Sequence, residues 1–174
     1  VYNVLGESAD FNPRYVIYSN YGGEAYCIDD DLMYCSMHGV VELNQNVREM
    51  CVNKYYGIAK WFEFARAMNS ECNYQNADAC WEPVAERLGL DAKKIADCEK
   101  NEALALLAPE KELNDILGVK GSPQIFIDGV EYSGNRDANS ILAAMCNAFD
   151  SEKPEGCSSV IASSVQDAPA GACG

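Results

Sequence analysis

Cysteine is the residue type with the most chemistry to offer in this chain, which has nine cysteines among 174 residues. They are Cys27, Cys35, Cys51, Cys72, Cys80, Cys98, Cys146, Cys157 and Cys173. No two of them have the Cys-x-x-Cys spacing that is typical of redox centres and zinc sites. A reducing cytosol gives little reason to keep so many scattered thiols. We therefore expect disulfides and an extracellular or periplasmic location.

The sequence leaves the connectivity of these disulfides open. An odd total means that one cysteine is free, pairs with another chain, or pairs with a segment outside this sequence. Cys173 is the candidate for an intermolecular bond. The pairs that local spacing favours are Cys72–Cys80 and Cys146–Cys157, followed by Cys27–Cys35 and Cys51–Cys98.

The only histidine, His38, follows Cys35 at Cys-x-x-His spacing, just before a predicted helix. A helix N-terminus and an imidazolium both stabilise a thiolate, so this pair could carry a reactive cysteine. The alternative, which we favour, is that Cys35 forms a disulfide and His38 caps the helix or packs against it. No second nucleophile stands at motif spacing nearby.

The acidic run Asp29-Asp30-Asp31 offers oxygen ligands of the kind that calcium prefers. Three adjacent carboxylates on an extended segment point in different directions, however, and lack the alternating spacing of a calcium loop. We therefore expect a solvated acidic loop here, and we predict no metal site and no cofactor.

The overall charge restricts the possible partners. The chain carries 27 acidic and 13 basic residues, which gives a net charge of -14, and its pI is about 4.3. Such a charge repels nucleic acid and anionic membrane surfaces, so we expect neither as a partner. No run of about 18 apolar residues is present, and the first residues lack the layout of a signal peptide.

The elements that must position these residues are mostly helical. Helical spacing of apolar residues predicts helices at 39–56, 58–68, 81–88, 91–98 and 101–117, with Gly57 between the first two and a break or new start at Pro109. Residues 1–9 read as the end of a helix, and Phe11 to Ser19 as a buried strand. The cysteines at 72 and 80 flank a short connection between helices.

A β-hairpin is predicted near the C-terminal end of the domain. Gln124 to Ile127 and Val130 to Tyr132 favour strands, and Asp128-Gly129 suits a two-residue type I′ turn. An amphipathic helix over 138–149 follows. Residues 151–174 are rich in Ser, Ala, Gly and Pro and read as a tail.

The order of loop, Gly121-Ser122-Pro123, Ile-Phe-Ile strand, hairpin and closing helix resembles the C-terminal half of the thioredoxin fold. The helices inserted at about 39–117 resemble those of DsbA-type exported thiol–disulfide oxidoreductases. The resemblance implies an α/β fold over residues 1–150: a thioredoxin-like sheet with a helical insertion, cross-linked by disulfides. It also implies that Pro123 is cis and that Gly121, Ser122 and Pro123 contact an extended peptide or protein substrate.

The chain departs from this family at its beginning, because the central first strand and the Cys-x-x-Cys are missing from it. We therefore assign no catalytic residue, and the first hypothesis is a DsbA-like protein whose redox-active half is absent from this chain. The alternative is a structural subunit of an extracellular oligomer or filament, completed by strand donation between copies, with 158–165 as the strand-like tail segment. A third possibility is a binding module that kept only the peptide-docking loop.

Overall fold

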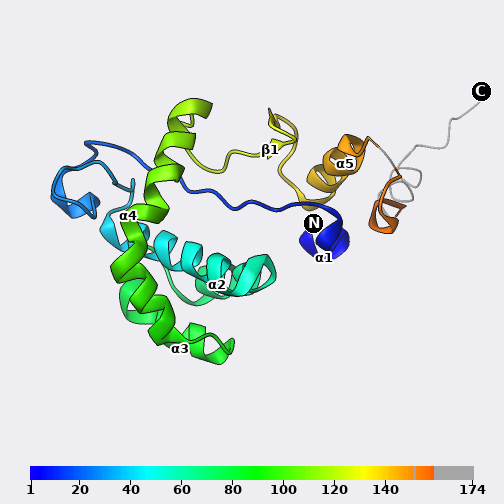
Figure 1. The fold of residues 1–174 in the computed structure, drawn as a ribbon. Helices are drawn as coiled ribbons and strands as arrows, with labels where there is room; N and C mark the ends of the chain where they lie inside the picture. Colours follow the sequence, from blue (N-terminus) through cyan, green and yellow to red (C-terminus); the bar gives the residue numbers. More distant parts are fainter. Residues whose placement is uncertain (151, 159–174) are drawn as a thin grey trace, which may run out of the picture. The chain divides into compact units, whose positions relative to one another are not determined.

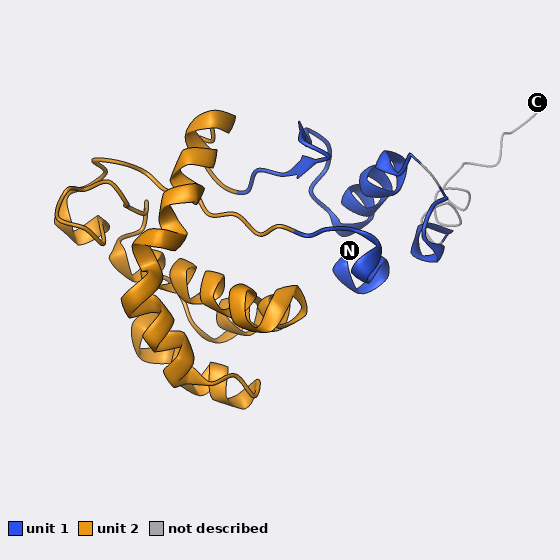
Figure 2. Ribbon diagram, in the orientation of Figure 1, with its two compact units in different colours: residues 1–11, 123–174 blue, residues 12–122 orange. Residues whose placement is uncertain are grey.

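The computed structural model describes residues 1–150 and 152–158. They form two compact units, each with its own apolar core (Figures 1 and 2). The larger unit consists of residues 12–122, and the smaller unit combines residues 1–11 with the chain from 123 onward. One boundary between the units therefore falls between Ser122 and Pro123, inside the predicted docking loop.

Three helices make up most of the larger unit, and α2 is the longest of them (Figure 1). Gly57 has φ of 81° and ψ of 173° within α2, so the helix is two helices joined at a kink. A left-handed φ is cheap only for glycine, which explains why the break falls at this residue. The prediction of two helices separated by Gly57 is confirmed. The bounds are α2 Val40–Glu71, α3 Ala77–Arg87 and α4 Ala92–Leu117.

Helix α4 begins and ends as the sequence predicts but does not break at Pro109. The Asp91 side chain accepts a hydrogen bond from the Lys94 amide, and Gly118 ends the helix in the left-handed conformation. The expected pair of helices, 91–98 and 101–117, is one helix of 26 residues. Proline removes one backbone hydrogen bond, but the helix is held on both sides of it by buried Leu107, Glu110 and Asn114.

The core of the larger unit lies between these helices. Leu43, Val47, Phe64, Ile95 and Leu107 are completely removed from solvent. The disulfide between Cys51 of α2 and Cys98 of α4 lies in the same cluster, and both of its cysteines are buried. The apolar faces of the helices therefore meet around the predicted long-range disulfide, which joins α2 to α4.

The predicted strand over Phe11 to Ser19 is wrong for most of its length. Among the described residues only Tyr18 forms a β-bridge there, with Cys35. Residues 12–17 run as an extended segment instead (Figure 1). The reason lies at Tyr15, where side chains of α4 take the backbone hydrogen bonds that a neighbouring strand would make.

The smaller unit contains the predicted hairpin. Phe126 pairs with Glu131 and Ile127 with Val130, in antiparallel register. Both turn residues have positive φ, 48° at Asp128 and 77° at Gly129, as a type I′ turn requires. The elements of this unit are α1 Tyr2–Leu5, a 3₁₀ turn Gly6–Ser8, β1 Phe126–Ile127, β2 Val130–Glu131, α5 Ala138–Ala148 and a 3₁₀ turn Glu155–Cys157.

A small core holds this unit together. Leu5, Leu142, Cys146 and Cys157 are buried, and a disulfide joins Cys146 to Cys157. The described chain is therefore mostly helical with a two-stranded sheet, which is less sheet than the sequence analysis expects. Among the described helices, none combines the length and the apolar character needed to cross a membrane.

The disulfides allow a paired stability test within the larger unit. Cys51 and Cys98 are 47 residues apart, whereas Cys72 and Cys80 are 8 apart. Because a cross-link restricts the unfolded chain more when it closes a longer loop, replacing Cys51 and Cys98 by Ala should lower the free energy of unfolding by about 4 kcal/mol. The same replacement of Cys72 and Cys80 should cost about 2.5 kcal/mol. Urea unfolding measures both losses of free energy. Equal losses would contradict the assignment of the Cys51–Cys98 and Cys72–Cys80 disulfides.

Candidate functional site

The predicted docking residues lie in an accessible loop after α4. Ser122 and Pro123 are exposed, and Gly121 is partly exposed. The Tyr18 hydroxyl donates a hydrogen bond of 3.3 Å to the carbonyl oxygen of the preceding residue, Lys120. The loop is therefore available to a ligand. A cis peptide bond at Pro123 and contact with a peptide stay predictions.

The eight cysteines of the described chain are all in disulfides. Cys173 lies outside the described residues. None of these four pairs has Cys-x-x-Cys spacing, and a cysteine held in a disulfide is not available as a thiolate nucleophile until the bond is reduced. The structure joins the pairs that the sequence favours, namely Cys27–Cys35, Cys51–Cys98, Cys72–Cys80 and Cys146–Cys157.

In the Cys35–His38 segment, Cys35 forms a disulfide, and the His38 side chain contacts the first turn of α2 without capping the helix. Cys35 is fully buried in its bond to Cys27. Glu42, in the first turn of α2, accepts hydrogen bonds from the His38 amide and from the Ser36 hydroxyl. The His38 Nδ1 atom lies 2.8 Å from Glu42 Oε1. Because the carboxylate stands between the serine and the histidine, the three do not form a nucleophilic triad.

The acidic loop is organised by one of its three carboxylates. Asp29 accepts hydrogen bonds from the amides of Met33 and Tyr34, which closes the loop on itself. Asp30 and Asp31 are exposed. Among the described residues, no group of three or more His, Cys, Asp and Glu side chains could hold a metal ion.

The structure assembles a polar cluster around Tyr15 that the sequence analysis does not predict. The Tyr15 hydroxyl donates to Glu49 Oε2 at 3.0 Å and accepts from Trp61 Nε1 at 2.7 Å. Gln45 donates to the other oxygen of Glu49 at 3.2 Å. Glu49 and Trp61 lie on the two sides of the Gly57 kink, so one hydroxyl links the extended segment to both halves of α2.

Burial changes the acidity of both groups in this cluster. Burial raises the pKa of Glu49, although the hydrogen bonds from Gln45 and Tyr15 act in the opposite direction. Burial, followed by the charge of Glu49, raises the pKa of Tyr15 well above its usual value. The Glu49 carboxyl therefore keeps its proton to a higher pH in the folded protein than in the unfolded chain.

The backbone of Tyr15 is held by α4. Its amide donates to Glu110 Oε2 at 3.2 Å, and its carbonyl accepts from Asn114 Nδ2 at 2.8 Å. Glu110 also forms an ion pair of 2.7 Å with Arg14. Both α4 side chains are buried, so they fix the position of the extended segment along the helix.

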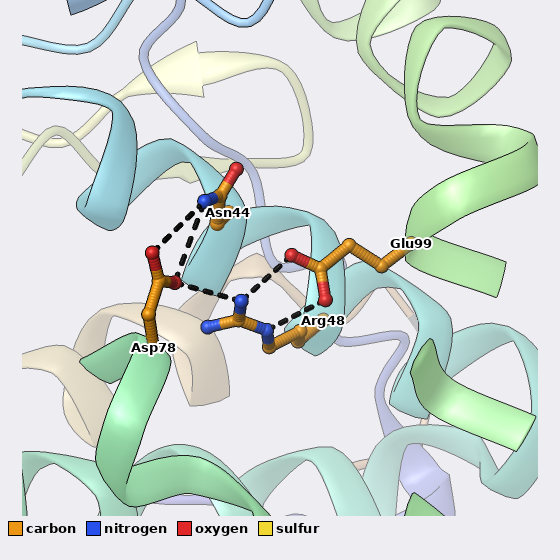
Figure 3. Close-up of polar contacts among 4 residues, drawn as sticks. All are labelled: Asn44, Arg48, Asp78 and Glu99. Carbon is orange, nitrogen blue, oxygen red and sulfur yellow. Dashed lines mark hydrogen bonds and ion pairs between the residues drawn. The ribbon is translucent and has the colours of Figure 1, made fainter. Parts of the chain in front are cut away.

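Arg48 of α2 is at the centre of a second polar cluster, which joins all three helices (Figure 3). Its side chain is only 5% exposed and forms ion pairs of 2.7 Å with Asp78 of α3 and Glu99 of α4. Two guanidinium nitrogens contact the two oxygens of Glu99, and Asn44 donates to Asp78. The guanidinium carbon lies 5.1 Å from the centre of the Trp81 ring.

This cluster is better suited to structural support than to ligand binding. Arg48 Nη1 is buried and has no hydrogen-bond partner within the described chain. The remaining guanidinium donors are already used by two carboxylates. A buried arginine in this position fixes the crossing of α2, α3 and α4 next to the Cys51–Cys98 disulfide.

Replacing Arg48 by Met should destabilise the larger unit by about 3 kcal/mol, because it leaves two carboxylates without their shared partner. The matched control is Arg87→Met, which breaks an exposed ion pair with Glu71. That change should cost less than about 1 kcal/mol. Chemical denaturation gives both values, and a small loss for Arg48→Met would show that the cluster contributes little to stability.

Glu49 should make stability depend on pH in a direction that can be tested. Its pKa is raised on folding, so the folded state binds the proton more tightly. The contribution of Glu49 to stability is therefore greatest below its unfolded pKa and is lost as pH rises through the folded pKa. The difference in unfolding free energy between Glu49→Gln and the original protein should grow in favour of the variant as pH rises from 4 to 7.5. A difference independent of pH would contradict this account.

Similarity to known proteins was found by comparison of sequences. Vacuolar-sorting receptor 6 of Arabidopsis thaliana is 27% identical over 123 residues, which cover 60% of this chain and 19% of the receptor. Vacuolar-sorting receptor 4 of the same plant is 27% identical over 122 residues, and vacuolar-sorting receptor 5 is 24% identical over 128. These matches cover 61% and 60% of this chain, respectively, and 19% of each receptor. The chain thus spans about a fifth of the length of these curated relatives. No solved structure matches.

The family model that matches describes a larger part of the chain. It is the vacuolar sorting receptor thioredoxin-like domain, and it matches residues 21–146. That range includes seven of the disulfide-bonded cysteines, all three main helices, the Ser122-Pro123 loop and the hairpin. The disulfide content and this similarity indicate a secretory-pathway location. The chain belongs to the family of vacuolar sorting receptor thioredoxin-like domains.

Proposed function

We propose that this chain is a non-catalytic protein-binding domain of the secretory pathway, which uses the thioredoxin-like docking loop without the redox chemistry. The observation that carries the proposal is the state of the cysteines: all eight in the described chain are in disulfides, none with Cys-x-x-Cys spacing. A domain without a thiolate can still hold a peptide, because docking needs only accessible backbone groups and a complementary surface.

The peptide contact is assigned to Gly121, Ser122 and Pro123. The accessibility of Ser122 and Pro123 supports this assignment, as does the hairpin that begins directly after them. The relatives are named as sorting receptors, which is consistent with a domain that recognises other proteins. A lumenal or extracellular site of action fits the four disulfides.

The first rival is an exported DsbA-like oxidoreductase whose redox-active half lies outside this chain. It shares the thioredoxin-like family and the docking loop with our proposal. It differs in requiring a low-pKa cysteine that is separated from a resolving cysteine by two intervening residues. The one histidine-flanked cysteine of this chain, Cys35, is buried in a disulfide, which favours binding over catalysis.

The second rival is a structural subunit completed by strand donation between copies. The observation in its favour is the small sheet, which has two strands among the described residues. This rival would use the tail segment 158–165 and Cys173, and of these, residues 159–165 and Cys173 lie outside the described residues. Sedimentation at micromolar concentration, with and without reductant, distinguishes a covalent or non-covalent oligomer from a monomer.

The binding proposal predicts an interaction that depends on the loop. A suitable probe is hen lysozyme that has been reduced and carbamidomethylated, since it is unfolded and has no free thiol. Pro123→Ala should weaken its binding by about fivefold, equivalent to about 1 kcal/mol, because the loop loses its fixed backbone. The control is Pro154→Ala, a second proline of the smaller unit, which should leave binding unchanged. Titration calorimetry measures both.

The same preparation tests the absence of redox turnover. The chain should not reduce the disulfides of insulin in the presence of dithiothreitol faster than dithiothreitol alone. Turnover above this background would favour the oxidoreductase.

Equal loss of binding in the Pro123→Ala and Pro154→Ala variants would contradict the assignment of the docking loop. Absence of binding to the unfolded lysozyme would also contradict it.

A further inference from the structure

Tyr18, Tyr21 and Tyr26 form a row of aromatic rings in the larger unit, which we call the tyrosine row. The ring centres of Tyr18 and Tyr21 are 5.0 Å apart, and those of Tyr21 and Tyr26 are 5.8 Å apart. All three residues are partly exposed. The rings therefore offer a continuous aromatic surface to a ligand, with their hydroxyl groups as polar contacts.

The tyrosine row is held in place before any ligand arrives. The backbone of Tyr18 exchanges two hydrogen bonds of 2.9 Å with Cys35, which is joined to Cys27 by a disulfide. A Cβ atom at Gly22 would collide with the Tyr26 ring, so this ring packs directly on a backbone position that only glycine allows. Little conformational entropy is lost when a ligand binds to tyrosine rings fixed in this way.

One end of the tyrosine row adjoins the predicted docking loop. The Tyr18 hydroxyl donates a hydrogen bond of 3.3 Å to the carbonyl oxygen of Lys120, the residue before Gly121. Tyr18, Lys120, Gly121 and Ser122 all belong to the larger unit, so this contact lies within one compact unit. A peptide held at Gly121 and Ser122 therefore has the tyrosine row next to it.

The stretch of sequence that carries the tyrosine row is acidic. Residues 15–47 contain no lysine and no arginine, although the chain has 13 basic residues. The carboxylates of this stretch are Glu24, Asp29, Asp30, Asp31 and Glu42. Glu24 falls between Tyr21 and Tyr26 in the sequence and is exposed. The local charge therefore favours a positively charged ligand.

The ionisation of Tyr18 reflects these surroundings. Burial raises the pKa of Tyr18, and Tyr21 and the charge of Glu42 act in the same direction. Lys120 brings a basic residue to the Tyr18 end of the row through its carbonyl contact. The end of the row formed by Tyr21 and Tyr26 is therefore the better place for a cation.

Aromatic rings with carboxylates nearby have the chemistry that recognises an arginine side chain. A planar guanidinium stacks on an aromatic face, and carboxylates balance its charge. This chain already contains such an arrangement in its core. The Arg48 guanidinium lies 5.1 Å from the centre of the Trp81 ring and forms ion pairs with Asp78 and Glu99.

We propose that the tyrosine row binds an arginine side chain of the partner segment that the docking loop holds. This inference rests on the proposed function as a protein-binding domain, and it names the side-chain chemistry of the partner. The rings supply the stacking surface, and Glu24 supplies a carboxylate beside them in the sequence. Arginine suits the site better than lysine, because an ammonium group is more strongly hydrated and has no planar face to stack.

Three matched peptides test the proposal on the whole chain. The probe is acetyl-Gly-Ser-Val-Arg-Val-Ser-Gly-amide, and its two partners carry citrulline or lysine in place of arginine. Citrulline keeps the shape of the side chain but has no charge. Titration followed by NMR should show that the citrulline peptide binds about fivefold more weakly than the arginine peptide, with the lysine peptide between them. The largest shifts should be those of the Tyr21 and Tyr26 ring protons.

Variants of the chain locate the contact. Tyr21→Leu and Glu24→Gln should each weaken binding of the arginine peptide by about threefold and leave the citrulline peptide nearly unchanged. The controls are Tyr74→Leu, at an exposed tyrosine of the Cys72–Cys80 loop, and Glu82→Gln, at an exposed carboxylate of α3. Both controls should bind the two peptides as the original chain does. Glu24→Gln leaves the rings in place, so it decides the matter if Tyr21→Leu does not fold.

Several outcomes would overturn the proposal. Equal affinity for the arginine and citrulline peptides, or no binding of the arginine peptide at millimolar concentration, excludes the tyrosine row as an arginine site. Equal affinity for the arginine and lysine peptides overturns the choice of arginine. If unfolded lysozyme binds in a Pro123-dependent way while the three peptides bind alike, the tyrosine row is wrong and the proposed function stands. If the arginine peptide depends on Tyr21 but lysozyme binding does not depend on Pro123, the docking loop is wrong instead.

Discussion

Each disulfide of this structure uses two thiols that could otherwise react, and it links two parts of the chain covalently. Cys51–Cys98 joins α2 to α4 inside the core of the larger unit, and Cys146–Cys157 lies in the core of the smaller unit. In a thioredoxin-like family the cysteines would otherwise be the first place to look for activity. Here all eight cysteines of the described residues are in disulfides, and we propose that the domain binds its partner through the docking loop instead.

Two polar clusters add further links between the elements that the disulfides connect. Arg48 joins α2, α3 and α4 through carboxylates on two neighbouring helices, while Tyr15 links the extended segment to α4 and to both halves of α2. Glu110 and Asn114 bind the backbone amide and carbonyl of Tyr15, which fixes this part of the segment along α4.

Local patterns in the sequence were sufficient to predict several features. These are the kink at Gly57, the cap at Asp91, the turn at Asp128-Gly129 and the pairing of cysteines close in sequence. Each depends on residues no more than 11 positions apart in the sequence. The strand expected at 11–19 and the break expected at Pro109 were wrong because contacts between residues 95 and 99 positions apart decide them. Glu110 and Asn114 replace a neighbouring strand at Tyr15, and their burial also carries α4 across the proline. The Arg48 and Tyr15 clusters went unpredicted for the same reason, since no local spacing marks side chains that meet only after folding.

The most direct test of the non-catalytic account is a count of accessible thiols by intact mass. The chain would be denatured without reductant, alkylated with iodoacetamide, and weighed. The account predicts at most one added group per chain, on Cys173, with all eight other cysteines protected in disulfides. Two or more added groups located on the cysteines between Cys27 and Cys157 would contradict it, because free thiols in that range would restore the means for redox chemistry.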